Sequence, residues 1–140
     1  LVLLVPSGHR LAGQRRVALQ DALAEPFVGL SEGNALQALV ATQARRLAPG
    51  WDCRVRLGSL EAVCRMVGLG AGVAVVPRAV AEREARAGAL RRIPLADAWA
   101  ARRLLLAARA LAALPAPAAG LARFLRQATG GGALAPAPEG

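Results

Sequence analysis

The chain has 140 residues, of which 55% are hydrophobic and only 3% aromatic, and its formal net charge is +9 at pH 7. That length suffices for one domain with a buried core, and no apolar run approaches the roughly 20 residues that a membrane-spanning helix needs. All 18 basic residues are arginines dispersed along the chain, and few aromatic rings are present to stack on bases, so we interpret the charge as a solvated basic surface rather than a nucleic-acid site.

The two cysteines and the single histidine do not form a recognisable metal-binding pattern. Cys53 and Cys64 lack CxxC spacing, and His9 lies far from both in the sequence. We therefore expect two reduced core thiols in a cytoplasmic protein, with a disulfide as the alternative. No metal or cofactor is expected.

The chain begins inside an apolar run, LVLLV, which ends at Pro6. Such a run is typical of a strand buried on both faces, and its position indicates a strand cut from a longer chain. A helical pattern follows at 18–25 and a second buried strand at 27–30. The next helix can be capped by Ser31 or Asn34, which lie in the turn SEGN.

The helix that starts at Asn34 has an apolar stripe with polar residues beside it. Its predicted inward residues are Leu36, Leu39, Val40 and Leu47, and its predicted outward residues are Gln37, Arg45 and Arg46. The following segment, CRVRL at 53–57, alternates apolar and charged residues, as a strand with one covered face does.

A second helix is predicted over 60–69, with Glu61 and Arg65 as an outward i,i+4 pair. Its predicted inward residues are Leu60, Val63, Cys64 and Val67. The glycines at 68–72 follow this helix and precede the strand VAVV at 73–76. A dinucleotide-binding loop has the opposite order, strand before helix, and GxGxxG rather than GxGxG spacing. We therefore interpret the glycines as the end of a helix and not as a nucleotide site.

Beyond Pro77, the pattern predicts a polar helix that ends at Gly88 and carries a Glu82–Arg86 pair. Two strands follow, at 90–95 and 102–108, joined by ADAWA. The last predicted helix, 115–128, has Leu121, Phe124 and Leu125 on its inward face. The remaining residues, 129–140, have too few apolar side chains to fold and are expected to be disordered.

This alternation of strands and helices predicts an α/β fold. The apolar strands at 1–5 and 73–76 bracket a compact α/β unit. That arrangement suits a lobe inserted between two crossing strands that act as hinges.

Three segments in this order resemble the effector-binding domain of LysR-type transcriptional regulators: LVLLVPSGHRLAG, VALQDALAEPFVGLSEGNAL and SLEAVCRMVGLGAGVAVVPRAVAE. The first carries a P-x-x-H-x-L-A turn, with Arg10 where the family has proline, and the last carries the helix-to-strand crossing V-x-x-G-x-G-V-x-V-V-P. The resemblance covers about residues 1–128. It implies a two-lobed, Rossmann-like fold similar to that of type 2 periplasmic binding proteins, with a small-molecule cleft between the lobes.

The resemblance also implies a division of the chain. Residues 1–6 would form the first crossing strand, 7–76 the second lobe with the return crossing strand, 77–128 the returning part of the first lobe, and 129–140 a tail. The expected hinge residues are Val5, Pro6, Val75 and Val76. The family's N-terminal helix-turn-helix would lie outside this chain, so we expect DNA contact only through that absent domain.

Ser59 is the leading candidate for contact with a ligand. It stands between the strand at 53–57 and the helix at 60–69, where a hydroxyl and the free amides of a helix N-terminus can hold an anion. The family places effector contacts at the same junction, which adds Gly58 and Leu60. The alternative is that Ser59 only caps its own helix.

Further candidates lie at two other positions in the sequence. Ser31, Gly33 and Asn34 form a similar strand-to-helix junction, which helix capping alone also explains. Val5 and Pro6 would line the floor of the cleft, although Pro6 can equally be a simple strand stop.

We therefore expect an effector-sensing domain that binds a small, anionic metabolite and belongs to a homo-oligomeric regulator with no membrane contact. A solute-binding protein of the same fold, serving transport, is the main alternative. An enzyme is disfavoured because the nine acidic residues and the single histidine show no paired catalytic spacing.

Overall fold

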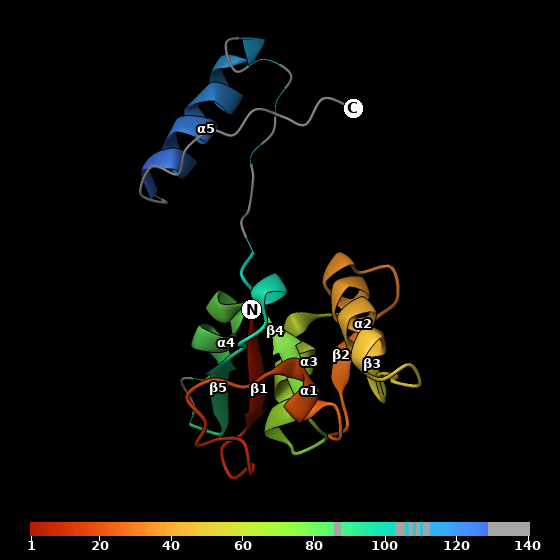
Figure 1. Cartoon of the computed structure of the whole chain (residues 1–140). Helices are drawn as coiled ribbons and strands as arrows, with labels where there is room; N and C mark the ends of the chain where they lie inside the picture. Colours follow the sequence, from red (N-terminus) through yellow and green to blue (C-terminus); the bar gives the residue numbers. More distant parts are fainter. Residues whose placement is uncertain (86–87, 103–105, 107, 109, 111–112, 129–140) are drawn as a thin grey trace. The chain divides into compact units, whose positions relative to one another are not determined.

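The computed structural model describes residues 1–85, 88–102, 106, 108, 110 and 113–128 (Figure 1). Its elements in chain order are β1 (Val2–Pro6), α1 (Leu19–Ala22), β2 (Val28–Leu30), α2 (Ala35–Leu47), β3 (Val55–Leu57), α3 (Leu60–Gly68), β4 (Ala74–Val76), α4 (Arg78–Glu84), β5 (Leu90–Pro94), the 3-10 helix η2 (Ala98–Ala100) and α5 (Ala116–Ala128). The predicted α/β class is confirmed. No helix among these residues is both long and apolar enough to cross a membrane.

The strands of the first unit lie in the order β3, β2, β4, β1, β5. β1 pairs antiparallel with β4 and with β5, and β2 pairs parallel with β3. A parallel bridge between Phe27 and Val73 joins the two groups. β1 therefore runs opposite to the other four described strands. As a result, the amino end of β1 lies at the same edge as the carboxyl ends of β2, β3, β4 and β5.

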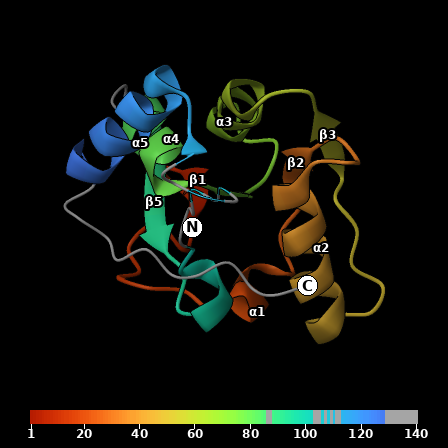
Figure 2. The same ribbon diagram turned by 90° about the horizontal axis from the view of Figure 1, so that it is seen from above.

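Helices cover both faces of these strands. α3 and α4 lie together on one face, and α1 and α2 lie together on the other (Figure 2). β1 occupies the centre, and its residues Leu3, Leu4 and Val5 are fully buried. The continuous apolar run at the start of the chain is thus explained by a strand that is covered on both faces.

α2 faces the strands differently from the prediction. Gln37, predicted to point outward, is buried, whereas Leu47, predicted to point inward, is 48% exposed. The Gln37 Oε1 accepts a hydrogen bond from the backbone N–H of Leu30 at 3.1 Å. Gly29 makes room for this amide, because a Cβ at Gly29 would lie 2.2 Å from Gln37 Oε1.

The glycine run ends a helix and leads into a strand, as predicted. α3 ends at Gly68, and β4 begins at Ala74. Gly70 and Gly72 have φ angles of 82° and 149°, which disfavour other residues. The chain also passes close to Pro26, because a Cβ at Gly72 would lie 2.1 Å from the Pro26 carbonyl oxygen.

Some predicted surface pairs differ in the structure. Glu61 pairs with Arg83 of α4 at 2.7 Å, and the described residues show no ion pair between Glu61 and Arg65. The predicted Glu82–Arg86 pair cannot be compared, because residue 86 lies outside the described residues. The same holds for most of the predicted strand at 102–108 and for the predicted disordered tail.

The last helix forms where it was predicted, and its apolar residues are not covered by the described residues of its own unit. Leu121, Phe124 and Leu125 of α5 are 57%, 64% and 40% exposed. Its buried residue is instead Ala122.

The chain divides into two compact units, Leu1–Arg102 and Arg103–Gly140. The end of the second lobe at residue 76 stays a prediction, and α4 and β5 belong to the same compact unit as β1 and β4. The physical reason is pairing: β5 forms a ladder with β1 along its whole length, from Leu90 opposite Pro6 to Pro94 opposite Val2. Val75 and Val76 accordingly lie inside this unit, opposite Leu3 and Val2.

Candidate functional site

Two of the predicted strand-to-helix junctions are neighbours at one edge of the strands. β2 and β3 run parallel and in register, with Leu30 opposite Leu57. Ser31 and Gly58 therefore leave the carboxyl ends of adjacent strands. In open α/β sheets, ligands bind at the carboxyl ends of the strands.

Ser31 joins the two junctions. Its backbone N–H and its hydroxyl both donate to the carbonyl oxygen of Leu57, at 2.9 and 3.1 Å. Because the hydroxyl proton is used in this bond, Ser31 is left with only acceptor capacity toward a ligand. Ser31 thus fixes the end of β2 against the end of β3.

Asn34 caps α2 and occupies its free amides. Its Oδ1 accepts hydrogen bonds from the backbone N–H groups of Leu36 at 2.9 Å and Gln37 at 3.4 Å. This confirms the predicted cap. Gly33, with a φ of 86°, shapes the turn before it.

Ser59 caps α3. Its Oγ accepts a hydrogen bond from the backbone N–H of Ala62 at 3.2 Å, and its hydroxyl group also stabilises the Glu61 carboxylate. The neighbouring Gly58 is exposed, and a Cβ there would meet nothing within 4 Å. Leu60, the first residue of α3, is half-buried. These three residues form an open junction with a hydroxyl and a helix N-terminus.

Glu61 was missed as a component of this junction. Its pKa is lowered because its own backbone N–H, and then the Ser59 hydroxyl and the Arg83 guanidinium, stabilise the charged carboxylate and together outweigh desolvation, which acts in the opposite direction. The carboxylate of Glu61 is therefore attracted to the same donors that an external anion would use. The available sequence signal was an acidic residue in the first turn of a capped helix, where the helix dipole favours negative charge.

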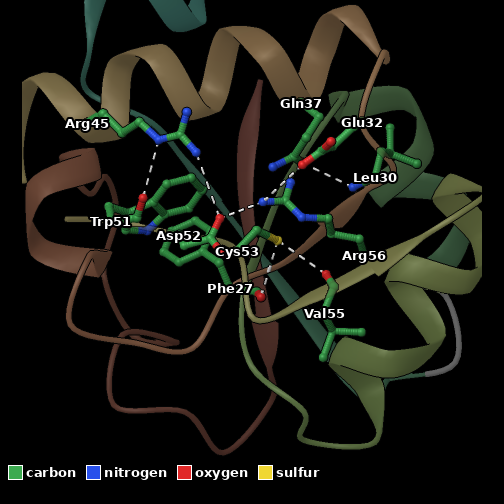
Figure 3. A network of polar contacts seen from close by, with 10 residues as sticks. All are labelled: Phe27, Leu30, Glu32, Gln37, Arg45, Trp51, Asp52, Cys53, Val55 and Arg56. Atoms are coloured by element: carbon green, nitrogen blue, oxygen red, sulfur yellow. Dashed lines mark hydrogen bonds and ion pairs between the residues drawn. The ribbon is translucent and has the colours of Figure 1, made fainter. Parts of the chain in front are cut away.

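A polar network supports β2 and β3 from the side of α2 (Figure 3). The Cys53 thiol donates to the carbonyl oxygens of Val55 at 3.2 Å and Phe27 at 3.4 Å. Arg56 pairs with Asp52, which also lies 3.8 Å from Arg45. These contacts hold the strands that carry Ser31 and Ser59 in place.

Val5 and Pro6 do not join this site. Pro6 lies opposite Leu90, the first residue of β5, and therefore at the edge where the other strands begin. The reason is the antiparallel direction of β1, whose carboxyl end points away from the carboxyl ends of β2 and β3. Val5 is also fully buried. The place of Val5 and Pro6 on the floor of a ligand cleft stays a prediction, at the opposite edge of the strands from Ser59.

At that opposite edge, His9 stabilises the loop that follows β1 through contacts with Glu25 and Leu11. Its Nε2 lies 3.3 Å from Glu25, its Nδ1 accepts a hydrogen bond from the backbone N–H of Leu11, and Arg10 pairs with the same carboxylate at 2.6 Å. Both cysteines are free and buried, so both lie in the core as predicted. The described residues contain no cluster of three His, Cys, Asp or Glu side chains that fits a metal ion.

The chain is similar to domains of known transcriptional regulators. A family model described as "LysR substrate binding domain" matches residues 1–130. A curated relative, an uncharacterized HTH-type transcriptional regulator from Methanocaldococcus jannaschii, is 34% identical over 109 residues. That alignment covers 76% of this chain but only 37% of the relative, so the chain spans well under half of the relative's length.

Solved structures show the same fold. HinK, a LysR family transcriptional regulator from Pseudomonas aeruginosa, is 27% identical with a TM-score of 0.55, over 69% of this chain and 33% of that protein. The CcmR regulatory domain from Synechocystis PCC6803, in complex with 2-PG, is 22% identical with a TM-score of 0.74, over 92% of this chain and 62% of that one. These similarities confirm the predicted type 2 periplasmic-binding-protein-like architecture.

Proposed function

Since the chain belongs to the LysR substrate binding domain family, we propose that it senses a small, anionic effector for a transcription regulator. The match of the family model over residues 1–130 is the observation that carries this proposal. The curated relative from Methanocaldococcus jannaschii, an HTH-type transcriptional regulator, supports it. So does the CcmR regulatory domain, whose structure contains the small molecule 2-PG.

Within this function, Ser59 and Gly58 contact the effector, and Leu60 lies beside it. The Ser31 hydroxyl donates to the carbonyl oxygen of Leu57, whereas the Ser59 hydroxyl interacts with the carboxylate of Glu61, for which an anionic effector would substitute. The amides at the start of α3 add a positive end of a helix dipole. Ser31 does not contact the effector in this proposal. Its two hydrogen bonds to Leu57 hold the carboxyl end of β2 beside the carboxyl end of β3.

Signalling then follows from a change in the arrangement of two lobes. The unit Leu1–Arg102 contains the proposed second lobe, and the proposed hinge residues are Val5, Pro6, Val75 and Val76. An effector that binds one arrangement more tightly shifts the equilibrium toward it. In the longer, homo-oligomeric regulator, this shift alters how a separate helix-turn-helix contacts DNA.

Two other functions fit the observations less well. A solute-binding protein for transport would share the fold, but the family model that matches is that of regulators. An enzyme would need paired catalytic groups, whereas the groups around Ser59 are a hydroxyl, amides and one carboxylate that pairs with Arg83. We therefore propose a sensor that binds its ligand without converting it.

The test compares Ser59→Asp with Ser7→Ala in the full-length protein. Aspartate keeps the helix cap but places a negative charge where the anion binds. Ser7 is exposed and follows β1, at the opposite edge. We expect the effector found by screening small carboxylates and phosphates in calorimetry to bind at least tenfold more weakly to Ser59→Asp, and within twofold of wild type to Ser7→Ala. Unchanged affinity of Ser59→Asp would remove the α3 junction from the site, and a protein that binds DNA equally with and without every effector tested would contradict the sensor function.

A further inference from the structure

The loop that follows β1 is closed around the imidazole of His9. It turns sharply, because the backbone N–H of His9 donates to the carbonyl oxygen of Pro6 at 3.0 Å and that of Ala12 donates to the carbonyl oxygen of His9 at 2.8 Å. Leu11, which lies inside this turn, is buried in the core. The His9 side chain is only 16% exposed. The imidazole is therefore part of the packed loop.

The two contacts of the His9 ring fix which nitrogen carries the proton. Nδ1 accepts a hydrogen bond from the backbone N–H of Leu11 at 3.2 Å, so Nδ1 has no proton of its own. A neutral imidazole has one N–H group, which is then on Nε2. Nε2 lies 3.3 Å from a carboxylate oxygen of Glu25, which accepts that proton. Neutral His9 thus bridges the Leu11 amide and the Glu25 carboxylate.

A second proton can enter this ring only at Nδ1. Nδ1 then becomes a donor and faces the N–H of Leu11, which is also a donor, so the hydrogen bond between them is lost. The part-buried amide of Leu11 is left without an acceptor, an unfavourable state that opening of the loop to water relieves. Histidine is the side chain whose charge most commonly changes between pH 8 and pH 5.

Two charged groups surround His9 in the described part of the chain, and neither takes up the proton in its place. Glu25 comes from the segment after α1 and Arg10 from the loop itself, and their side chains pair at 2.6 Å. Burial acts to raise the pKa of Glu25, but the hydrogen bonds from Arg10 and His9 outweigh it, so the pKa is lowered and the carboxylate stays charged. Arginine stays protonated in proteins. Proton uptake by this cluster therefore occurs at His9.

We propose that His9 is a proton-dependent latch, which holds the loop after β1 closed when it is neutral and releases the Leu11 amide when it is protonated. The loop then opens on acidification while the strands stay paired. Because the His9 N–H is bound to Pro6, the change occurs directly beside the carboxyl end of β1. The latch follows from the contacts of one ring and does not depend on the function proposed above.

Hydrogen exchange of the full-length protein between pH 8 and pH 5.5 tests the latch. Mass spectrometry with electron-transfer fragmentation reads single amides, and division by the intrinsic rate at each pH gives a protection factor. We expect the protection of the Leu11 amide to fall at least about tenfold toward pH 5.5. The control is the Ala62 amide, which also donates to a side chain, the Ser59 hydroxyl, but one that does not titrate. Its protection should change less than twofold.

Three variants define the two states of the latch. His9→Asn keeps a side-chain acceptor for the amide two residues further on, and asparagine does not titrate, so Leu11 should stay protected at every pH. His9→Ala has no acceptor and should show at pH 8 the low protection that wild type reaches at pH 5.5. Glu25→Gln removes the carboxylate that favours the protonated ring, and the fall in protection should move to lower pH.

The comparison of wild type with His9→Asn decides the outcome even if His9→Ala does not fold, which circular dichroism detects. A Leu11 amide whose protection is independent of pH in wild type would overturn the proposal. The same fall in His9→Asn as in wild type would overturn it as well, since asparagine cannot take up the proton. Equal falls at Leu11 and Ala62 would show a general loosening in acid and not a latch.

Discussion

Asp97 caps a helix that begins 78 positions earlier in the chain. Its Oδ2 accepts a hydrogen bond from the backbone N–H of Leu19, the first residue of α1, at 2.8 Å. The residue at the cap position itself, Ala18, has a methyl side chain that accepts no hydrogen bond. The segment after β5 thereby completes the start of a helix near the beginning of the chain.

Replacing Asp97 by Ala should lower the free energy of unfolding by about 1 kcal/mol, with an expected range of roughly 0.5–2 kcal/mol for a lost cap. Asp97→Asn keeps a side-chain oxygen acceptor and should retain most of the stability. Urea denaturation followed by circular dichroism measures both. If Asp97→Ala and Asp97→Asn unfold at the same urea concentration, the capping bond contributes nothing.

Gly72 should be the least replaceable glycine of the run that follows α3. A Cβ there would lie 2.1 Å from the Pro26 carbonyl oxygen, and the φ of 149° adds strain. Gly72→Ala should therefore cost at least about 3 kcal/mol of stability. Gly70→Ala is the control, since its φ is also positive but its Cβ would meet nothing within 4 Å, and it should cost only about 1 kcal/mol. Equal midpoints of the two variants in urea would contradict the close approach to Pro26.

The features that the sequence predicted correctly depend on neighbouring residues. Asn34 and Ser59 each accept hydrogen bonds from backbone N–H groups no more than three residues further along the chain. The glycines that end α3 directly precede β4. Local hydrogen bonds and φ preferences decide such features, so a short window of sequence contains the information.

The features that the sequence did not predict depend on contacts between distant segments. Gln37 is buried because Gly29 of another element leaves space for its amide, a match that helical periodicity does not encode. Pro6 lies at the opposite edge from Ser59 because β1 runs antiparallel to its neighbours, and an apolar strand has the same composition in either direction.

Gln37→Ala should be destabilising although it replaces a polar residue in a largely apolar interior. The substitution leaves the buried N–H of Leu30 without its acceptor, which costs about 1–3 kcal/mol. Gln37→Glu is a useful comparison, since it keeps an oxygen at the same place but adds a buried charge. We expect both variants to unfold at lower urea concentration than wild type. If Gln37→Ala is as stable as wild type, water replaces the lost acceptor at no cost.

Glu61→Gln should increase the affinity for an anionic effector at the α3 junction. The Glu61 carboxylate, whose pKa is lowered first of all by its own backbone N–H and then by Ser59 and Arg83, stays charged and competes for the donors. Neutral glutamine competes less. Glu84→Gln is the matched control, because Glu84 also contacts Arg83, at 3.0 Å, but lies on α4. Calorimetric titration should show tighter binding, by about threefold to tenfold, in Glu61→Gln only, and an equal gain in both variants would point to net charge instead.

The two thiols should react slowly in the folded protein. Burial, together with the nearby carboxylates of Glu84 and Glu61, raises the pKa of Cys64 to about 11. Burial likewise raises the pKa of Cys53, whose thiol donates to two carbonyl oxygens. At pH 8 the thiolate fraction of Cys64 is therefore about 100-fold below that of a thiol with a pKa near 9.

Alkylation with iodoacetamide at pH 7–10 measures this difference. The Cys53→Ala variant isolates Cys64, whose rate should rise about tenfold per pH unit over the whole range, whereas the rate in guanidinium chloride should level off near pH 9. Stability has the matching dependence. The pKa of Cys64 is higher in the folded protein than in the unfolded chain. Its contribution to the free energy of unfolding is therefore fully present below pH 9 and is lost as the pH rises from 9 toward 11. Fast alkylation that levels off near pH 8 in the folded protein would show that Cys64 is an accessible, reactive thiol.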